Sequence, residues 1–97
     1  MASEKYVAAD MGASSGRVIV GILENGKLVI EEMHRFDNGP VEKDGSLFWD
    51  SDMIFREIKT GVKKAFAKYP DIISFAADTW GVDYVFIKED GTFARAP

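Results

Sequence analysis

The stretch Ala9-Asp10-Met11-Gly12-Ala13-Ser14-Ser15-Gly16-Arg17 decides the architecture of this chain. An apolar run at 6–9 precedes its polar part, and a second apolar run at 18–23 follows it. Two such runs around a small, polar, glycine-containing segment are typical of a strand, a turn and a second strand. The sequence therefore predicts a hairpin that carries a carboxylate, Asp10, at the end of its first strand.

This turn has the groups needed to hold a phosphate. Gly12 and Gly16 let the backbone approach a bulky anion, and the hydroxyls and free backbone N–H groups between them can donate to phosphate oxygens. A carboxylate beside the turn can bind Mg²⁺ or its water shell. The segment is not a P-loop, because no Gly-Lys-Ser/Thr follows, and it is not the dinucleotide fingerprint, because a strand and not a helix comes next.

A third strand and a small excursion follow the hairpin. Asn25-Gly26 is the pair best suited to a type I′ turn, so the sequence predicts that residues 27–36 complete a three-stranded meander. Residues 37–40 are rich in turn-forming types and break this meander. Asp44-Gly45 then turns the chain through a short excursion that ends at Trp49.

The next segment has the pattern of an amphipathic helix. Asp50 or Ser51 is a suitable N-cap, and Tyr69-Pro70 ends the helix because the residue before proline is pushed out of the α region. Apolar residues at helical spacing form one stripe between these ends, with Phe55 at its margin, namely Ile54, Ile58, Val62, Ala65 and Phe66. We expect this stripe to face the sheet.

The last third of the chain predicts two more strands. Residues 72–77 form a short, continuous apolar run, which suits a central buried strand. Residues 83–88 form a further strand, and residues 89–92 turn it into a short final one. The chain is therefore one α/β unit in the order β-β-β-α-β, without linker or repeat.

Composition narrows the class of protein. The net charge of −4 and pI near 4.9 argue against nucleic acid or an anionic membrane as a partner. The absence of cysteine excludes a disulfide framework and a thiolate metal site. No signal-peptide pattern is visible, and no apolar run approaches roughly 18 residues, so we expect a cytoplasmic enzyme. His34, the one histidine, lies in a strand without a second ligand nearby and is expected to be structural.

Two blocks of the sequence resemble a known family. The segment from Asp10 to Arg17 is similar to the first phosphate motif of the actin, hexokinase and heat-shock ATPase superfamily, in the form carried by the FGGY carbohydrate kinases. Asp78-Thr79-Trp80-Gly81-Val82-Asp83-Tyr84-Val85 resembles a sugar-side segment of that family, and residues 34–39 and Trp49-Asp50 match at compatible spacing. The resemblance covers nearly the whole chain.

This resemblance implies a ribonuclease-H-like fold with a mixed sheet, the N-terminal subdomain of the actin/hexokinase superfamily. In that fold the strand after the helix lies parallel beside the first strand. Asp10 and Asp78 would then end neighbouring strands at the edge of the sheet where ligands of open α/β sheets bind.

The resemblance also implies ATP and Mg²⁺ as cofactors and a sugar as substrate. The ATP phosphates would contact Ala13, Ser14, Ser15, Gly16 and Arg17, with Asp10 beside the magnesium ion. Gly81 would touch the sugar, together with Trp80 and Asp83. The expected reaction is ATP-dependent phosphorylation of L-rhamnulose at its 1-hydroxyl, with fuculose, xylulose or another polyol as alternative substrates.

Kinases of this family are two-lobed and several times longer than 97 residues. Residues 1–97 are therefore expected to be a truncated N-terminal fragment of the first lobe. The aspartate that accepts the hydroxyl proton and the adenosine site would lie beyond Pro97, so no catalytic base is assigned here and the fragment alone should be inactive. Apolar surface left uncovered by the truncation would favour self-association.

Each of these residues also has a purely structural interpretation. The glycines can serve a tight turn, and Arg17 can pair with a surface acid. Asp78 and Asp83 can cap backbone groups in their loop, and Trp80 can pack at the edge of the core.

Two other functions stay open at the level of sequence. A two-metal nuclease on the same fold would use Asp10, Glu57 and Asp78 as ligands, although the acidic net charge and the phosphate-type turn argue against it. A non-catalytic, kinase-derived module that binds sugar or nucleotide would lack the second lobe and its aspartate.

Overall fold

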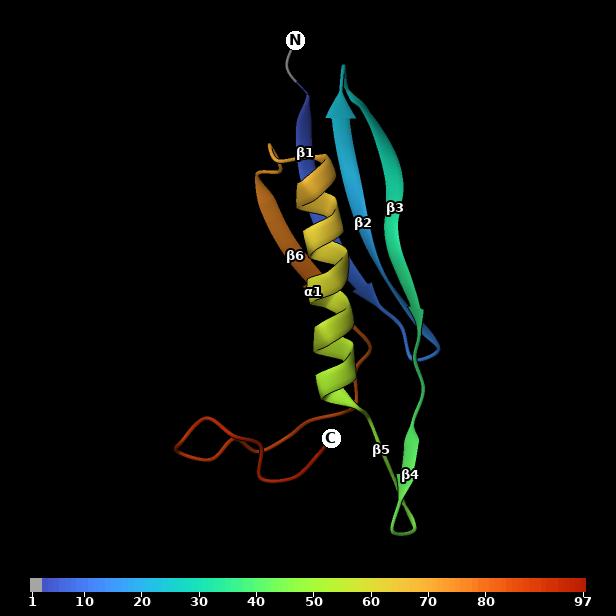
Figure 1. Ribbon diagram of the computed structural model, residues 1–97, viewed down its shortest axis with the longest axis vertical. Coiled ribbons are helices and arrows are strands. Elements are labelled where there is room, and N and C mark those ends of the chain that lie inside the picture. The colour runs from blue at the N-terminus through green and yellow to red at the C-terminus, as the bar shows by residue number, and fades with distance from the viewer. Residues whose placement is uncertain (1–2) are drawn as a thin grey trace.

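The computed structural model describes residues 3–97 and has a four-stranded sheet with one long helix packed on one face (Figure 1). A small hairpin extends beyond one end of the sheet, and a long irregular segment follows the last strand. The elements in chain order are β1 (Glu4–Met11), β2 (Ser15–Glu24), β3 (Lys27–Asp37), β4 (Val41–Lys43), β5 (Ser46–Phe48), α1 (Ser51–Lys68) and β6 (Ser74–Asp78).

The predicted meander is present. β1, β2 and β3 pair antiparallel, and β1 and β2 stay in register from Asp10 opposite Arg17 to Glu4 opposite Leu23. Asn25 and Gly26 have φ angles of 54° and 74°, as a type I′ turn requires. Asp44-Gly45 has the same pair of positive φ angles, 52° and 79°, so the expected excursion is a second hairpin, β4–β5.

Both ends of α1 lie where the sequence predicts them. The Asp50 carboxylate accepts the backbone N–H of Met53 at 3.0 Å, which caps the first turn, and the Tyr69 N–H closes the last turn on Ala65. The apolar stripe is partly wrong, because Phe55 and Phe66 are exposed and Gly61 is buried. A Cβ on Gly61 would lie 2.4 Å from Val18 Cγ2, so the helix approaches β2 most closely there.

The strand after the helix lies parallel beside β1, as the resemblance implies. β6 pairs with β1 from Tyr6 opposite Ser74 to Asp10 opposite Asp78, which makes the sheet mixed in the order β3-β2-β1-β6. The prediction of a central buried strand is wrong for the described residues: β6 is an edge strand with exposed side chains, and only Ile72 before it is buried. The apolar run at 72–77 therefore gives β6 a surface that no other element within the described residues covers.

The core lies between α1 and the helix-facing side of the sheet. Alternate residues of β1 and β2 point toward the helix, as the pleat of a strand requires. Two groups of buried side chains result, Val7, Val18, Val20, Ala65 and Ile72 in one, and Ala9, Met11 and Phe36 in the other.

The predicted strand at 83–88 is wrong. The segment after β6 contains only an isolated bridge between Ile87 and Phe93, closed by a turn in which Gly91 has a φ of 86°. A strand forms only where a neighbouring strand accepts its hydrogen bonds, and none of the described strands lies beside this segment. Within residues 3–97 no helix is long and apolar enough to cross a membrane.

Candidate functional site

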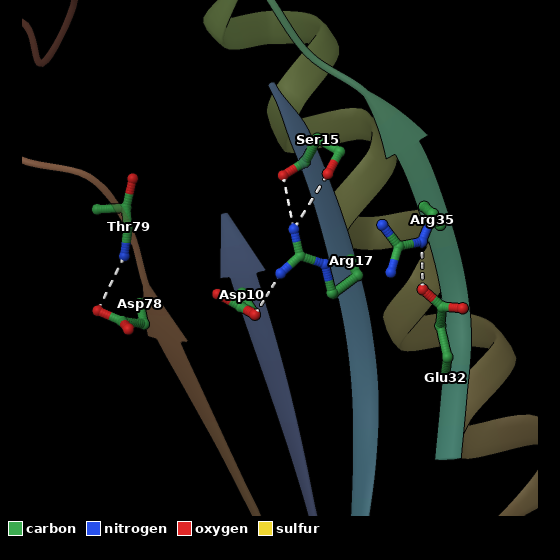
Figure 2. A network of polar contacts seen from close by, with 7 residues as sticks. All are labelled: Asp10, Ser15, Arg17, Glu32, Arg35, Asp78 and Thr79. Atoms are coloured by element: carbon green, nitrogen blue, oxygen red, sulfur yellow. Dashed lines mark hydrogen bonds and ion pairs between the residues drawn. The ribbon is translucent and has the colours of Figure 1, made fainter. Parts of the chain in front are cut away.

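Two aspartates meet at one edge of the sheet. Asp10 and Asp78 are register partners on the parallel strands β1 and β6, each at the carboxyl end of its strand (Figure 2). The Asp78 carboxylate also accepts the backbone N–H of Thr79 at 3.1 Å. The prediction that Asp10 and Asp78 end neighbouring parallel strands at the same edge of the sheet is therefore confirmed.

Asp10 is also paired across the hairpin with Arg17. Arg17 Nη1 lies 2.6 Å from Asp10 Oδ2, and Arg17 Nη2 donates to the carbonyl oxygen and the hydroxyl of Ser15 at 3.0 and 3.1 Å (Figure 2). Because Ala9 and Met11 on either side of Asp10 are buried under the helix, this ion pair lies on the opposite face of the sheet. Asp10 keeps 45% of its side chain exposed, so a ligand can reach it.

Asn38 holds the turn that connects β1 and β2. Its backbone N–H donates to the Ser14 carbonyl and its side-chain amide donates to the Gly12 carbonyl, both at 3.0 Å. The Gly12 N–H closes the turn on Ser15 O, also at 3.0 Å. This role of Asn38 was missed from the sequence, because Gly12 lies 26 residues away along the chain.

The tip of this turn presents free donors. Ala13 and Ser14 are exposed, and within residues 3–97 their backbone N–H groups make no hydrogen bond. Successive free N–H groups in a turn form a concave donor site for an anion. Gly16 differs from them, because it is buried and a Cβ there would lie 2.4 Å from Phe36 Cζ.

The carboxylates at this edge fit a magnesium ion bound together with a phosphate. In the described part of the chain, no three side chains of the histidine, aspartate or glutamate types gather into a metal cage. Mg²⁺ usually binds through one or two carboxylates plus substrate phosphates and water. Asp10 and Asp78 can supply such a pair next to the free donors of the turn.

The predicted sugar residues lie beyond the end of β6. Asp83 Oδ2 accepts the indole N–H of Trp80 at 2.6 Å and that of Trp49 at 3.1 Å. The two indole rings lie 4.5 Å apart at an angle of 50°. Gly81 is exposed, and a Cβ added to it would have nothing within 4 Å, while Val82 beside it is fully exposed with a φ of 69°. A β-branched residue is strained in that conformation.

A pocket of about 280 Å³ lies against this group of residues. It is lined by Trp49, Ser51, Ile54, Phe55, Ile58, Thr79, Trp80, Asp83 and Pro97. A larger hollow of about 590 Å³ lies between the β4–β5 hairpin, the start of α1 and Arg95, and it contains none of the predicted site residues. The smaller pocket is the better candidate because Thr79 connects it to Asp78.

The three carboxylates of the nuclease alternative do not come together. Glu57 on α1 bonds His34 Nε2 at 2.6 Å, on the helix side of the sheet, whereas Asp10 lies on the other side. Lys64 contacts the other ring nitrogen of His34 at 3.0 Å. His34 therefore links β3 to α1, which agrees with its expected structural role.

Comparisons with curated proteins find close relatives along most of the chain. It is 49% identical over 84 residues to the rhamnulokinase of Oceanobacillus iheyensis and 45% identical over 90 residues to that of Bacillus subtilis. These matches cover 87% and 93% of this chain. The chain spans only 18% and 19% of the length of these relatives.

Solved structures show the same fold at low sequence identity. The crystal structure of gluconate kinase from Lactobacillus acidophilus superimposes on 98% of this chain and 19% of its own, with a TM-score of 0.77 at 14% identity. A Ppx/GppA family member from Aquifex aeolicus covers 80% of this chain and 26% of its own, with a TM-score of 0.58 at 20% identity. No family model matches the chain.

Proposed function

We propose that this chain, a relative of the rhamnulokinases among the FGGY carbohydrate kinases, is the N-terminal part of the first lobe of an ATP-dependent ketose kinase. The observation that carries the proposal is the meeting of Asp10 and Asp78 at the carboxyl ends of parallel strands, directly beside a turn with free N–H groups. Phosphoryl transfer depends on positioning and charge neutralisation, and this edge of the sheet offers both.

The turn is the proposed site of the ATP phosphates. The free N–H groups of Ala13 and Ser14 and the hydroxyls of Ser14 and Ser15 would donate to phosphate oxygens. Gly16 would contribute through its place at the start of β2, where its missing side chain leaves room for Phe36. Arg17 would hold Ser15 and Asp10 in place and bring positive charge close to the phosphates.

Asp10 is the proposed carboxylate next to magnesium, with Asp78 as its neighbour. When bound, Mg²⁺ would neutralise charge on the transferred phosphoryl group. Arg17 neutralises part of the charge on this carboxylate pair, which reduces the repulsion between Asp10 and Asp78.

The loop after β6 is the proposed sugar edge. Gly81, which has open space around it, would lie against the ketose, with Trp80 and Asp83 beside it. We propose L-rhamnulose, phosphorylated at its 1-hydroxyl, as the substrate, because the curated relatives are named for that sugar. The aspartate that accepts the hydroxyl proton and the adenosine site would belong to the rest of the kinase, in the cytoplasm where ATP is available.

The test is a coupled kinase assay on the complete protein with Mg-ATP and L-rhamnulose, L-fuculose or xylulose. We expect the highest kcat/KM with L-rhamnulose, and no turnover above background from the 97-residue chain alone. A preference for fuculose or xylulose would contradict the proposed substrate but still support the proposed kinase activity. Absence of phosphorylation of every sugar, with ATP or sugar still bound, would favour the non-catalytic module instead.

A further inference from the structure

One carboxylate oxygen joins two indoles that lie far apart in the sequence. Both Trp49 and Trp80 donate their Nε1–H to Asp83 Oδ2. Within residues 3–97 the other oxygen, Oδ1, makes no hydrogen bond, so it is available to a ligand. A carboxylate can accept several hydrogen bonds, and this arrangement uses only part of its capacity.

The two indoles are held at other points as well. The backbone N–H of Trp49 donates to the Pro97 carbonyl at 2.8 Å. Trp80 packs against the buried group formed by Ala9, Met11 and Phe36. An indole that turned would lose its hydrogen bond to Asp83, so the pair presents one aromatic surface to the adjoining pocket.

We propose that Trp49 and Trp80 form the wall against which the methyl-bearing end of a 6-deoxy ketose lies, with Asp83 as the positioning residue that holds both indoles. This inference rests on the proposed function and assigns Trp49, which sequence reasoning left without a role, to the recognition of the sugar. Asp83 Oδ1 would accept a hydrogen bond from a hydroxyl of the same sugar.

The lining of the pocket explains why the deoxy end fits. Ile54, Phe55 and Ile58 on α1 add apolar side chains beside the two indoles, so most of the pocket is apolar. Its volume of about 280 Å³ lies just below the usual range of ligand pockets, which suits a monosaccharide better than a larger ligand. Thr79 lines the same pocket and directly follows Asp78, so the opposite end of the sugar can point toward the phosphate edge.

L-Rhamnulose and L-fructose give a matched pair of substrates, since the first is the 6-deoxy form of the second. An apolar pocket rejects an added hydroxyl by up to about a hundredfold. We therefore expect the complete kinase to favour L-rhamnulose over L-fructose in kcat/KM by about 10- to 100-fold. Trp49→Ala should raise the KM for L-rhamnulose at least about tenfold, leave kcat and the KM for ATP nearly unchanged, and reduce the preference for the deoxy sugar.

Conservative variants separate the ring from its hydrogen bond. Trp49→Phe keeps an aromatic face and should change the KM less than Trp49→Ala does. Asp83→Asn keeps an acceptor for the indoles and should retain most of the sugar preference, whereas Asp83→Ala should lose it. Phe66→Ala, on α1 but outside the pocket, is the control and should match wild type.

Circular dichroism gives a readout independent of activity. Indoles as close as 4.5 Å couple and give an exciton couplet, so the spectrum of wild type minus Trp49→Phe should contain one. The same couplet should weaken in Asp83→Ala and persist in Asp83→Asn. A wild-type difference spectrum without a couplet would contradict the aromatic wall.

The two proposals fail in different ways. Suppose that the protein phosphorylates L-rhamnulose while Trp49→Ala keeps the wild-type KM and sugar preference. The proposed aromatic wall is then wrong, and the proposed kinase activity is still supported. If no ketose is phosphorylated, the kinase is wrong, and the wall is then decided by L-rhamnulose quenching of tryptophan fluorescence. Quenching that Trp49→Ala weakens supports the wall, and quenching that is absent or unaffected overturns it.

Discussion

Glycines at two predicted binding positions have different physical roles. A Cβ on Gly16 would meet Phe36 Cζ at 2.4 Å and Met11 Sδ at 3.0 Å, so this glycine is required by the packing beneath the turn. Gly81 has open space on every side, and its φ lies outside the left-handed range. The fold therefore depends on Gly16, and only a ligand would require Gly81.

Gly16→Ala should destabilise the chain. The added methyl has no room beside Phe36, and overpacking of this kind costs about 1–3 kcal/mol. The matched control is Gly21→Ala on the same strand, whose Cβ would meet only the flexible end of Leu28 at 3.3 Å, and it should change stability by less than about 1 kcal/mol. Denaturant unfolding measures both variants. Equal stability of the two would show that the space around Gly16 relaxes easily.

Gly81→Val should leave the unfolding midpoint of the complete kinase unchanged, because a Cβ at this position would contact nothing within residues 3–97. If the ketose lies against Gly81, the same change should raise the KM for the sugar strongly and leave the KM for ATP as in wild type. Thermal unfolding and substrate kinetics on one preparation check both statements. Normal unfolding together with a wild-type sugar KM would remove Gly81 from the proposed sugar site.

Part of the candidate site could be predicted from the sequence, from its residue types and its turn-forming segments. The Asp10 to Arg17 turn and the Asn25-Gly26 hairpin depend on neighbours in the chain, so they were predictable. Asn38 and Trp49 act on partners that lie 26 and 34 residues away, at Gly12 and Asp83. No local pattern indicates such contacts, and only the folded chain reveals them.

At the scale of elements, β3 and the end of α1 are joined by one carboxylate. Glu31 accepts hydrogen bonds from the Lys68 ammonium and from the Tyr69 hydroxyl. The Lys68 hydrogen bond, followed by that of Tyr69, lowers the pKa of Glu31 below its ordinary value of 4.5. Similarly, the hydrogen bond from Lys5 lowers the pKa of Asp71. The charged form of this second carboxylate therefore also stabilises the folded state.

This arrangement predicts a loss of stability in acid. Because the folded-state pKa of Glu31 is depressed, its contribution is fully present above about pH 4.5 and is lost as the pH falls through the folded value. Glu31→Gln should therefore lower stability at neutral pH and flatten the decline below pH 4.5. Unfolding curves between pH 7 and pH 3 measure the effect. Glu24→Gln, whose side chain makes no hydrogen bond within residues 3–97, should keep the wild-type profile, and an equally flattened profile in that control would contradict the assignment.

The elements themselves were predictable to different degrees. The meander and both helix ends follow from turn pairs, an aspartate cap and the proline after Tyr69. The wrong prediction at 83–88 has a physical cause, because strand formation there needs a distant partner that a local pattern does not show. The prediction of the apolar stripe of α1 missed Gly61. This residue faces the sheet because its missing side chain lets α1 approach β2 closely, and not because it is hydrophobic.

At the scale of the whole molecule, both edges of the sheet are uncovered. β6 is an edge strand, and Phe75 on it is half exposed, while Leu28, Val29 and Ile30 are exposed on β3. Unpaired strand edges with apolar side chains favour pairing with another chain. The extended shape in Figure 1 leaves both edges of the sheet accessible.

The 97-residue chain alone is therefore expected to self-associate into dimers or larger species. Light scattering coupled to gel filtration over a range of concentrations measures this directly. Phe75→Lys places a charge on the edge strand and should favour the monomer, whereas Phe86→Lys, in the loop beyond the sheet, should not. A wild-type monomer at the highest concentration would contradict the expectation.

The central claim is that the carboxylate edge built by β1 and β6 acts on the transferred phosphoryl group. Its most direct test is the kinetics of Asp10→Asn in the complete kinase, with Asp37→Asn at the end of β3 as the control. The account predicts that Asp10→Asn lowers kcat by about 10²–10³ with little change in the KM for the ketose, because a group near magnesium acts on charge that develops in the transition state. Asp37→Asn should keep the wild-type rate. A near-normal kcat in a correctly folded Asp10→Asn enzyme would contradict the claim and leave Asp10 as a structural partner of Arg17.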